Sequence, residues 1–225
     1  MRESALYLSL EVELYYWHIT AMTLETTSAT ASDFAVARQA MIDSQLRPQG
    51  VTDARVLAAM AAVPREDFVP AEVRPLAYSD RPVPLGQGRA LAPPAALGEV
   101  LEALLPQDGE RALVIGGGTG YSAAVLEAMG LKVTAIDAAD GPLESGHSKG
   151  APYDVILIDG AVPAIPDALV AQLGDGGRLG GTVIDGGISK SVVGLKAGKA
   201  FGLRFIGDSG FPPLPGFAKP LAFTF

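Results

Sequence analysis

The chain has 225 residues, of which 48% are hydrophobic and 19% charged, and it carries a formal net charge of −8. This apolar content excludes extensive disorder, and the absence of cysteine excludes disulfide frameworks, zinc ribbons, iron–sulfur clusters and thiol nucleophiles. Two histidines are too few for most histidine-built metal sites, and the negative charge opposes a nucleic-acid or anionic-membrane partner, because phosphates are bound by concentrated positive charge.

The N-terminal extension, residues 1–32, contains a strand pattern. Apolar side chains alternate with other residues at a period of two over residues 6–16. Such a strand would join a sheet edge or pair with a second copy in a homodimer; alternatively, Met22 is the natural start and the preceding residues are non-native or poorly ordered. Two glutamates make the segment a poor export signal and no stretch reaches the ~20 apolar residues of a membrane span, so we expect a cytoplasmic protein.

Residues 33–94 are expected to form a helical cover followed by a proline-rich loop. The spacing of apolar side chains predicts one helix over residues 33–46 and a second over 53–63, with Thr52 as its cap. The loop at 64–94 holds seven prolines and little periodicity. A loop of this length inside a compact domain is usually functional, but a proline-stiffened wrap over a sheet explains it equally well.

The remaining residues, 95–225, alternate between helical and strand patterns. The predicted helices are 95–105, 121–129 and 166–173. The predicted strands are 111–115, 132–136, 153–158 and 176–184, with 202–207 and 221–225 as further candidates. Apolar strands that alternate with helices predict an α/β fold with a mainly parallel, doubly wound sheet.

A glycine-rich turn follows the first of these strands. Gly116, Gly118 and Gly120 allow a tight turn and close approach of a ligand to the backbone, and the next helix offers free N–H groups. Asp137 ends the next strand, where a carboxylate can accept hydrogen bonds from both ribose hydroxyls of a nucleoside. Tyr121 stands where a nicotinamide-binding turn needs its third glycine, so the pattern favours another nucleoside ligand.

Four segments carry a family resemblance: VPREDFVP, AYSDRPVPLGQG, ALVIGGGTGYSAAVLEAM and APYDVILIDGAVPAIPDALVAQL. In order and spacing they resemble the protein-L-isoaspartate O-methyltransferase family, from about Asp33 to about Leu179. The resemblance implies a Rossmann-like, seven-stranded methyltransferase sheet that binds S-adenosylmethionine and methylates isoaspartyl carboxylates of damaged proteins. It implies cofactor contacts at Gly116, Gly118, Gly120, Asp137 and Asp159, and substrate contacts at Gly88, Arg89 and Ala92.

The substrate loop departs from the family pattern. In this loop Ala90 and Ala92 stand where the family has hydroxyl side chains, and Pro93 where it has an amide. Outside the loop, Val114 stands two residues before the first glycine of the turn, where the family has an acid. No catalytic residue can therefore be named. Arg89 is the new polar group, and it would either pair with a carboxylate of a protein or peptide substrate or lie solvated in the loop.

The segment between Asp137 and Tyr153 is too short for the helix, strand and helix that the family fold places there. We expect residues 138–152 to form a loop, the sheet to lack one edge strand, and the wall beside the adenine ring to be missing. Binding of S-adenosylmethionine should then be weak or absent. Two hypotheses remain: an isoaspartyl-type methyltransferase, with a changed substrate as one possibility, or a catalytically silent methyltransferase fold that acts as a binding or assembly partner.

Overall fold

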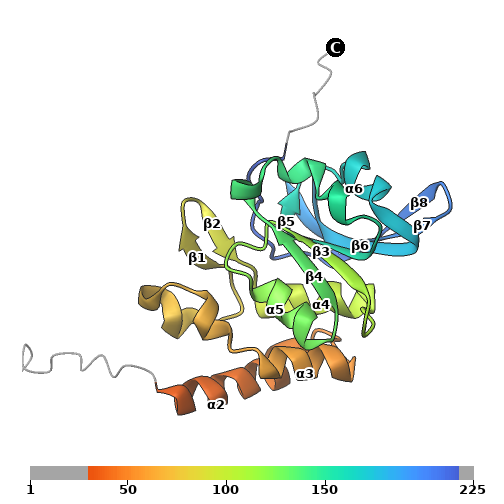
Figure 1. The fold of residues 1–225 in the computed structure, drawn as a ribbon. Coiled ribbons are helices and arrows are strands. Elements are labelled where there is room, and N and C mark those ends of the chain that lie inside the picture. The colour runs from red at the N-terminus through yellow and green to blue at the C-terminus, as the bar shows by residue number, and fades with distance from the viewer. Residues whose placement is uncertain (1–29, 218–225) are drawn as a thin grey trace, which may run out of the picture. The chain divides into compact units, whose positions relative to one another are not determined.

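The computed structural model describes residues 30–217, so the strand predicted at 6–16 and the candidate strand at 221–225 lie outside the described residues. The chain divides after Asp33 into two compact units. Of the first unit, the structure describes only the start of a helix, where the Asp33 carboxylate accepts hydrogen bonds from the backbone N–H and the hydroxyl of Thr30, each at 2.8 Å. The second unit holds the remaining elements (Figure 1).

The elements follow the predicted alternation of helices and strands closely. The helices are α2 (Ala31–Met41), α3 (Ala54–Ala62), α4 (Pro94–Leu104), α5 (Tyr121–Ala128) and α6 (Asp167–Ala171). The strands are β1 (Val83–Gly86), β2 (Arg89–Leu91), β3 (Arg111–Ile115), β4 (Lys132–Ile136), β5 (Tyr153–Val162), β6 (Leu173–Asp185), β7 (Ile188–Ala197) and β8 (Ala200–Asp208). A π-helical turn, Ile42–Leu46, extends α2 to the end of its predicted range.

The cap of α3 differs from the prediction by one residue. Asp53, not Thr52, is the N-cap: its carboxylate accepts a hydrogen bond from the backbone N–H of Arg55 at 2.8 Å. The Thr52 hydroxyl donates instead to Glu102 at 2.8 Å. Both residue types can cap a helix, so the local pattern does not discriminate between neighbouring candidates, and a partner in α4 decides.

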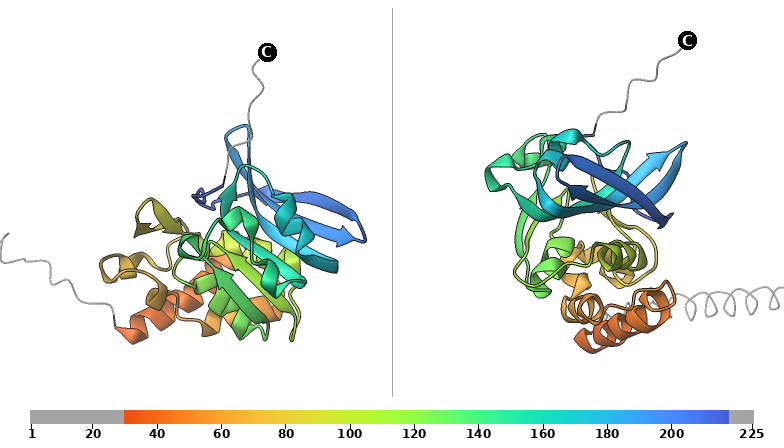
Figure 2. Two further views of the ribbon diagram at one scale, coloured as in Figure 1. Left: turned by 45° about the horizontal axis from the view of Figure 1, so that its top comes forward. Right: turned by 90° about the vertical axis from the view of Figure 1, so that its right-hand side faces the viewer.

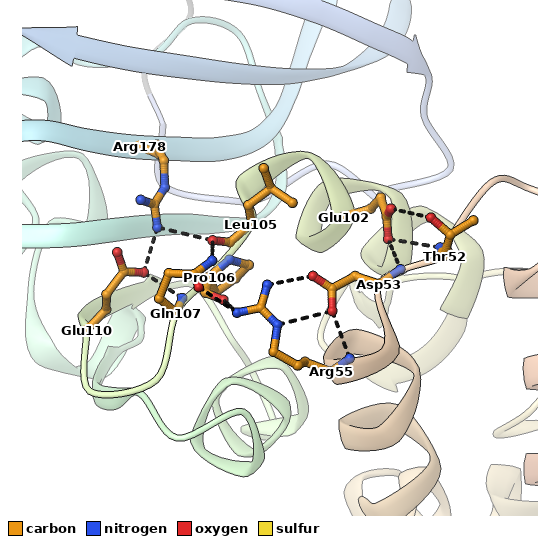
Figure 3. Close-up of polar contacts among 9 residues, drawn as sticks. All are labelled: Thr52, Asp53, Arg55, Glu102, Leu105, Pro106, Gln107, Glu110 and Arg178. Carbon is orange, nitrogen blue, oxygen red and sulfur yellow. Dashed lines mark hydrogen bonds and ion pairs between the residues drawn. The ribbon is translucent and has the colours of Figure 1, made fainter.

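Polar contacts tie the start of α3 to α4 and to the loop that follows it (Figure 3). The Glu102 carboxylate of α4 accepts hydrogen bonds from the backbone N–H groups of Thr52, at 3.0 Å, and Asp53, at 2.8 Å. The Arg55 guanidinium donates to the carbonyl of Pro106 at 2.9 Å. The Glu102 carboxylate thus satisfies backbone N–H groups at the start of α3, and Arg55 ties the helix to the segment after α4.

The main sheet has six strands in the order β4-β3-β5-β6-β7-β8 (Figure 1). The first four of these are parallel, whereas β7 and β8 pair antiparallel, which confirms the mainly parallel sheet. The sequence analysis did not predict β7. Its signal was the turn at Gly186 and Gly187, whose φ angles of +57° and +83° suit a two-residue hairpin. Figure 2 shows β7 and β8 as a long blue hairpin.

The shortened segment 138–152 forms no strand and consists of short helical turns. Three 3₁₀ helices occupy Ala138–Asp140, Leu143–Ser145 and Ser148–Gly150. In the described part of the chain, β4 therefore ends the sheet on this side, where a seven-stranded sheet would continue. The expected loss of one edge strand agrees with this topology.

Both faces of the sheet are covered, as a doubly wound sheet requires. Along β3, Ala112 and Val114 point into a core shared with α3, α4 and α5, whereas Leu113 and Ile115 point into a second core that includes α6. Gly180 of β6 lets α4 approach closely, because a Cβ there would lie 2.7 Å from Cδ1 of Leu104. The sheet thus presents the carboxyl ends of β3, β4 and β5 at one edge, where ligands bind in open α/β folds.

Candidate functional site

The glycine turn between β3 and α5 has the tight backbone that its glycines allow. Gly116, Gly118 and Gly120 have φ angles of +77°, +55° and +92°, in the region that side chains other than glycine rarely adopt. The N–H of Gly116 donates to the carbonyl of Ile136 at 2.9 Å, which ties the turn to the end of β4. The turn and Asp137 are therefore neighbours.

The C-terminal part of the described chain packs against this turn. A Cβ at Gly116 would lie 2.5 Å from Cδ1 of Leu214, so only glycine fits beneath this side chain. Leu214 is held in place because its N–H donates to the carbonyl of Ala161 at 2.8 Å, and the N–H of Ala161 donates to Pro212 at 2.8 Å.

Asp137 follows β4 directly and is engaged by Arg89. Nη1 of Arg89 contacts both carboxylate oxygens of Asp137, at 2.6 Å from Oδ2, and Nη2 donates to the carbonyl of Gly116. The side chain of Arg89 is 22% exposed and that of Asp137 32%. Arg89 is therefore an ion-paired residue of the site, and the interpretation of a solvated loop arginine is wrong.

Arg89 lies on a hairpin that the sequence analysis expected to be irregular. Within the loop at 64–94, β1 and β2 pair antiparallel, and the turn residues Gln87 and Gly88 have φ angles of +52° and +72°. Two left-handed residues in sequence define a turn that favours hairpins. The hairpin lies over the glycine turn: a Cβ at Gly118 would lie 3.2 Å from Nη2 of Arg89 and 3.5 Å from Cδ1 of Leu85.

A fully buried arginine supports the substrate loop. Arg65 donates from Nε to the carbonyl of Ala77 at 2.6 Å and from Nη2 to the carbonyl of Ala92. Its guanidinium lies 4.8 Å from the ring centroid of Tyr121, which is also fully buried. The side chain of Ala92 is buried in the core, so at this position the backbone makes the polar contact. Arg65 is not among the predicted site residues, since a charged residue gives no local sign that it will be buried.

Asp159 lies in β5 and is held by the start of α5. The hydroxyl of Ser122 donates to its carboxylate. Burial raises the pKa of Asp159, although the hydrogen bond from Ser122 and the positive charges of Arg65 and Arg89 act in the opposite direction. Asp159 is thus electrostatically coupled to the Arg89–Asp137 pair.

The structure brings four of the eight expected site residues together at one edge of the sheet. Arg89, Asp137, Gly116 and Gly118 lie together. Gly88 lies in the hairpin turn, and Val114, which replaces the family acid, is buried in the core. In residues 30–217, no group of three or more potential metal ligands occurs, and no helix is both long and apolar enough to cross a bilayer.

The residues at this edge fit a nucleoside cofactor. The carboxylate of Asp137 is partly exposed beside a glycine turn whose backbone a ligand can approach, and such a carboxylate suits ribose hydroxyls. The fit carries one condition. Nη1 of Arg89 contacts both oxygens of Asp137 and the N–H of Ala138 donates to one of them, so a ribose must compete with the guanidinium for this carboxylate.

Comparison with known proteins agrees with this geometry. The family model for protein-L-isoaspartate(D-aspartate) O-methyltransferase matches residues 36–137 and 126–185. Protein-L-isoaspartate O-methyltransferase 2 of Marinobacter nauticus is 41% identical over 171 residues, which cover 65% of this chain and 77% of the relative. The protein-L-isoaspartate O-methyltransferase of Methylorubrum extorquens is 41% identical over 178 residues, which cover 70% and 78%.

A solved structure shares the fold at low sequence identity. It is a putative protein-L-isoaspartate O-methyltransferase from Plasmodium falciparum in complex with S-adenosyl-L-homocysteine, with a TM-score of 0.67 and 16% identity, covering 80% of this chain and 98% of that one. The family model spans most of the helical cover, the hairpin, the glycine turn and Asp137. The chain therefore belongs to the protein-L-isoaspartate O-methyltransferase family.

Proposed function

We propose that this protein is an S-adenosylmethionine-dependent methyltransferase that esterifies the α-carboxylate of isoaspartyl residues in proteins or peptides. The observation that carries the proposal is the partly exposed carboxylate of Asp137 beside the glycine turn, in a chain that belongs to this family. The family membership supports the reaction, and the position of Asp137 supports the cofactor class.

The residues of the site divide the work of binding. Asp137 would accept hydrogen bonds from the ribose hydroxyls, and the free N–H groups at the start of α5 would face the carboxylate end of the cofactor. The cofactor supplies a methyl group activated by its sulfonium. A substrate carboxylate is already ionised at pH 7, so the chain needs no general base and contributes by positioning and charge.

We propose that the cofactor binds weakly. The 3₁₀ turns of residues 138–152 replace the longer segment that would stand beside the adenine, so Asp137 holds the ribose with little support for the base. Calorimetric titration should then give dissociation constants above ordinary cofactor concentrations. Micromolar binding would contradict the idea of an open adenine site.

The reaction is tested by incubating the full-length protein with labelled S-adenosylmethionine and a peptide that contains one isoaspartyl residue. The same peptide with a normal aspartyl residue is the matched control. We expect a base-labile methyl ester on the isoaspartyl peptide alone. No ester above a control without enzyme would reject the proposed reaction.

One observation favours the alternative of a silent methyltransferase fold. The substrate loop carries Ala90 and Ala92 in place of hydroxyl side chains, and Arg89 occupies the carboxylate that a cofactor would use. A binding or assembly protein of this kind would retain its protein partner after substitution of Gly118 and would give no heat with S-adenosylmethionine. Loss of the partner together with loss of cofactor binding would argue against it.

A further inference from the structure

Arg89 competes with any ligand for the Asp137 carboxylate, whose Oδ1 also accepts a hydrogen bond from the backbone N–H of Ala138 at 2.7 Å. Nη1 of Arg89 contacts both oxygens of Asp137, and Nη2 donates to the carbonyl of Gly116. Nη2 also lies 3.2 Å from the point where a Cβ at Gly118 would stand, so the guanidinium lies directly on the glycine turn. A ribose that donates two hydrogen bonds to Asp137 therefore competes with Arg89 for the same oxygens.

The pair is held loosely enough to open. Both side chains are partly exposed, so water solvates the two charges as they separate, and opening the pair costs about 1 kcal/mol. Arg89 also belongs to the β1–β2 hairpin, which is separate from the main sheet. The guanidinium can leave Asp137 by rotation of the Arg89 side chain, and the main sheet need not move when it does.

Release would leave a cation where the substrate loop lacks its hydroxyl donors. Ala90 has no polar side-chain atom and the side chain of Ala92 is buried, so Arg89 is the polar side chain nearest to them in the loop. A guanidinium pairs with a carboxylate through two parallel N–H donors, so the released Arg89 is suited to the carboxylate of a substrate.

We propose that Arg89 exchanges partners during the reaction, which makes it a residue that sets the order of binding. In the free protein it closes the nucleoside site by pairing with Asp137. Binding of the cofactor takes over the Asp137 carboxylate, and the freed guanidinium then receives the carboxylate of the isoaspartyl substrate. The cofactor consequently binds before the peptide. This inference rests on the proposed function, whose site it uses.

The first test measures binding of S-adenosylhomocysteine by calorimetry to the wild type, Arg89→Met and Arg81→Met. Methionine keeps an unbranched stem and removes the guanidinium, and Arg81 is an exposed arginine of the same segment. We expect Arg89→Met to bind about tenfold more tightly, equal to about 1.4 kcal/mol, because nothing competes for Asp137. Arg81→Met should bind like the wild type.

A residue with a structural role, or one that contacts the cofactor directly, would give the opposite result. Binding by Arg89→Met that is equal to or weaker than that of the wild type, or absent in both, would overturn the proposal. Arg89→Lys keeps the charge but cannot contact Asp137 and Gly116 in the same way, so its affinity should lie between those of the wild type and Arg89→Met. An affinity outside that range would also count against the exchange.

The second test titrates the isoaspartyl peptide with and without saturating S-adenosylhomocysteine. The wild type should bind the peptide at least tenfold more tightly when S-adenosylhomocysteine is present, and Arg89→Met should show no such gain. Equal peptide affinity in both conditions would refute the ordered exchange. If Arg89→Met binds S-adenosylhomocysteine more tightly but the wild type forms no ester, the proposed function fails and the pairing that closes Asp137 stands. If the wild type forms the ester but Arg89→Met does not bind more tightly, the proposed function stands and the exchange of partners fails.

Discussion

Replacement of Gly116 by alanine should destabilise the protein for two separable reasons. Its φ of +77° lies in the left-handed region, which costs a residue with a Cβ about 1–2 kcal/mol. The new Cβ would also lie 2.5 Å from Cδ1 and 2.6 Å from Cδ2 of Leu214, and overpacking of this kind costs about 1–3 kcal/mol. The free energy of unfolding should therefore fall by about 2–5 kcal/mol.

Two further variants separate these costs. Gly120 has a φ of +92° but no atom within 4 Å of its missing Cβ, so Gly120→Ala should lose only the backbone part, about 1–2 kcal/mol. Leu214→Val removes both Cδ atoms and should recover most of the overpacking in combination with Gly116→Ala. Urea unfolding at 25 °C measures all four variants. Two results would refute the close contact between a Cβ at residue 116 and Leu214. One is an equal loss of unfolding free energy for the two glycine substitutions. The other is additivity of Gly116→Ala and Leu214→Val within about 0.5 kcal/mol in the double variant.

Three other perturbations test the described contacts. Arg65→Met should lower the free energy of unfolding by about 2–4 kcal/mol, because it leaves two backbone carbonyls without donors. Urea titration measures this change, and an unchanged free energy of unfolding would show that these hydrogen bonds are weak. The raised pKa of Asp159 means that the folded state keeps a proton which the unfolded chain has released. The free energy of unfolding should therefore fall as pH rises from about 4 through the folded pKa. Asp159→Asn should remove this slope in unfolding curves between pH 4 and 7. Asp53→Ala should cost about 1 kcal/mol by removing the cap of α3, and a smaller effect than that of Thr52→Ala would show that the cap is assigned to the wrong residue.

The strands of the sheet could be predicted from the sequence because their cause is local. The segments 111–115 and 132–136 are apolar, short and bounded by turn residues, and β3 and β4 have these bounds. The glycine turn was predictable for the same reason, since φ angles of this kind require glycine. β7 was not predicted because serine, lysine and glycine interrupt its apolar residues, although the glycine pair before it marks a hairpin turn.

The contacts that define the site could not be predicted in this way. Arg89 and Asp137 are 48 residues apart, and their pairing depends on where the hairpin packs against the sheet. Arg65 is buried because the carbonyls of Ala77 and Ala92 converge on it, which only the folded chain arranges. Sequence patterns specify elements and candidate residues; which charges meet is decided by tertiary packing.

The acceptor for the first N–H groups before α3 comes from a distant part of the chain, and this has a consequence for how the protein folds. Glu102 follows Asp53 by 49 residues, so its carboxylate reaches the start of α3 only once α4 has formed and docked. Closing a loop of that length costs entropy before the contact repays it. We therefore expect a peptide of residues 34–63 to be largely unstructured by itself. In the full chain, the same helices should gain protection from hydrogen exchange in the same kinetic step as α4.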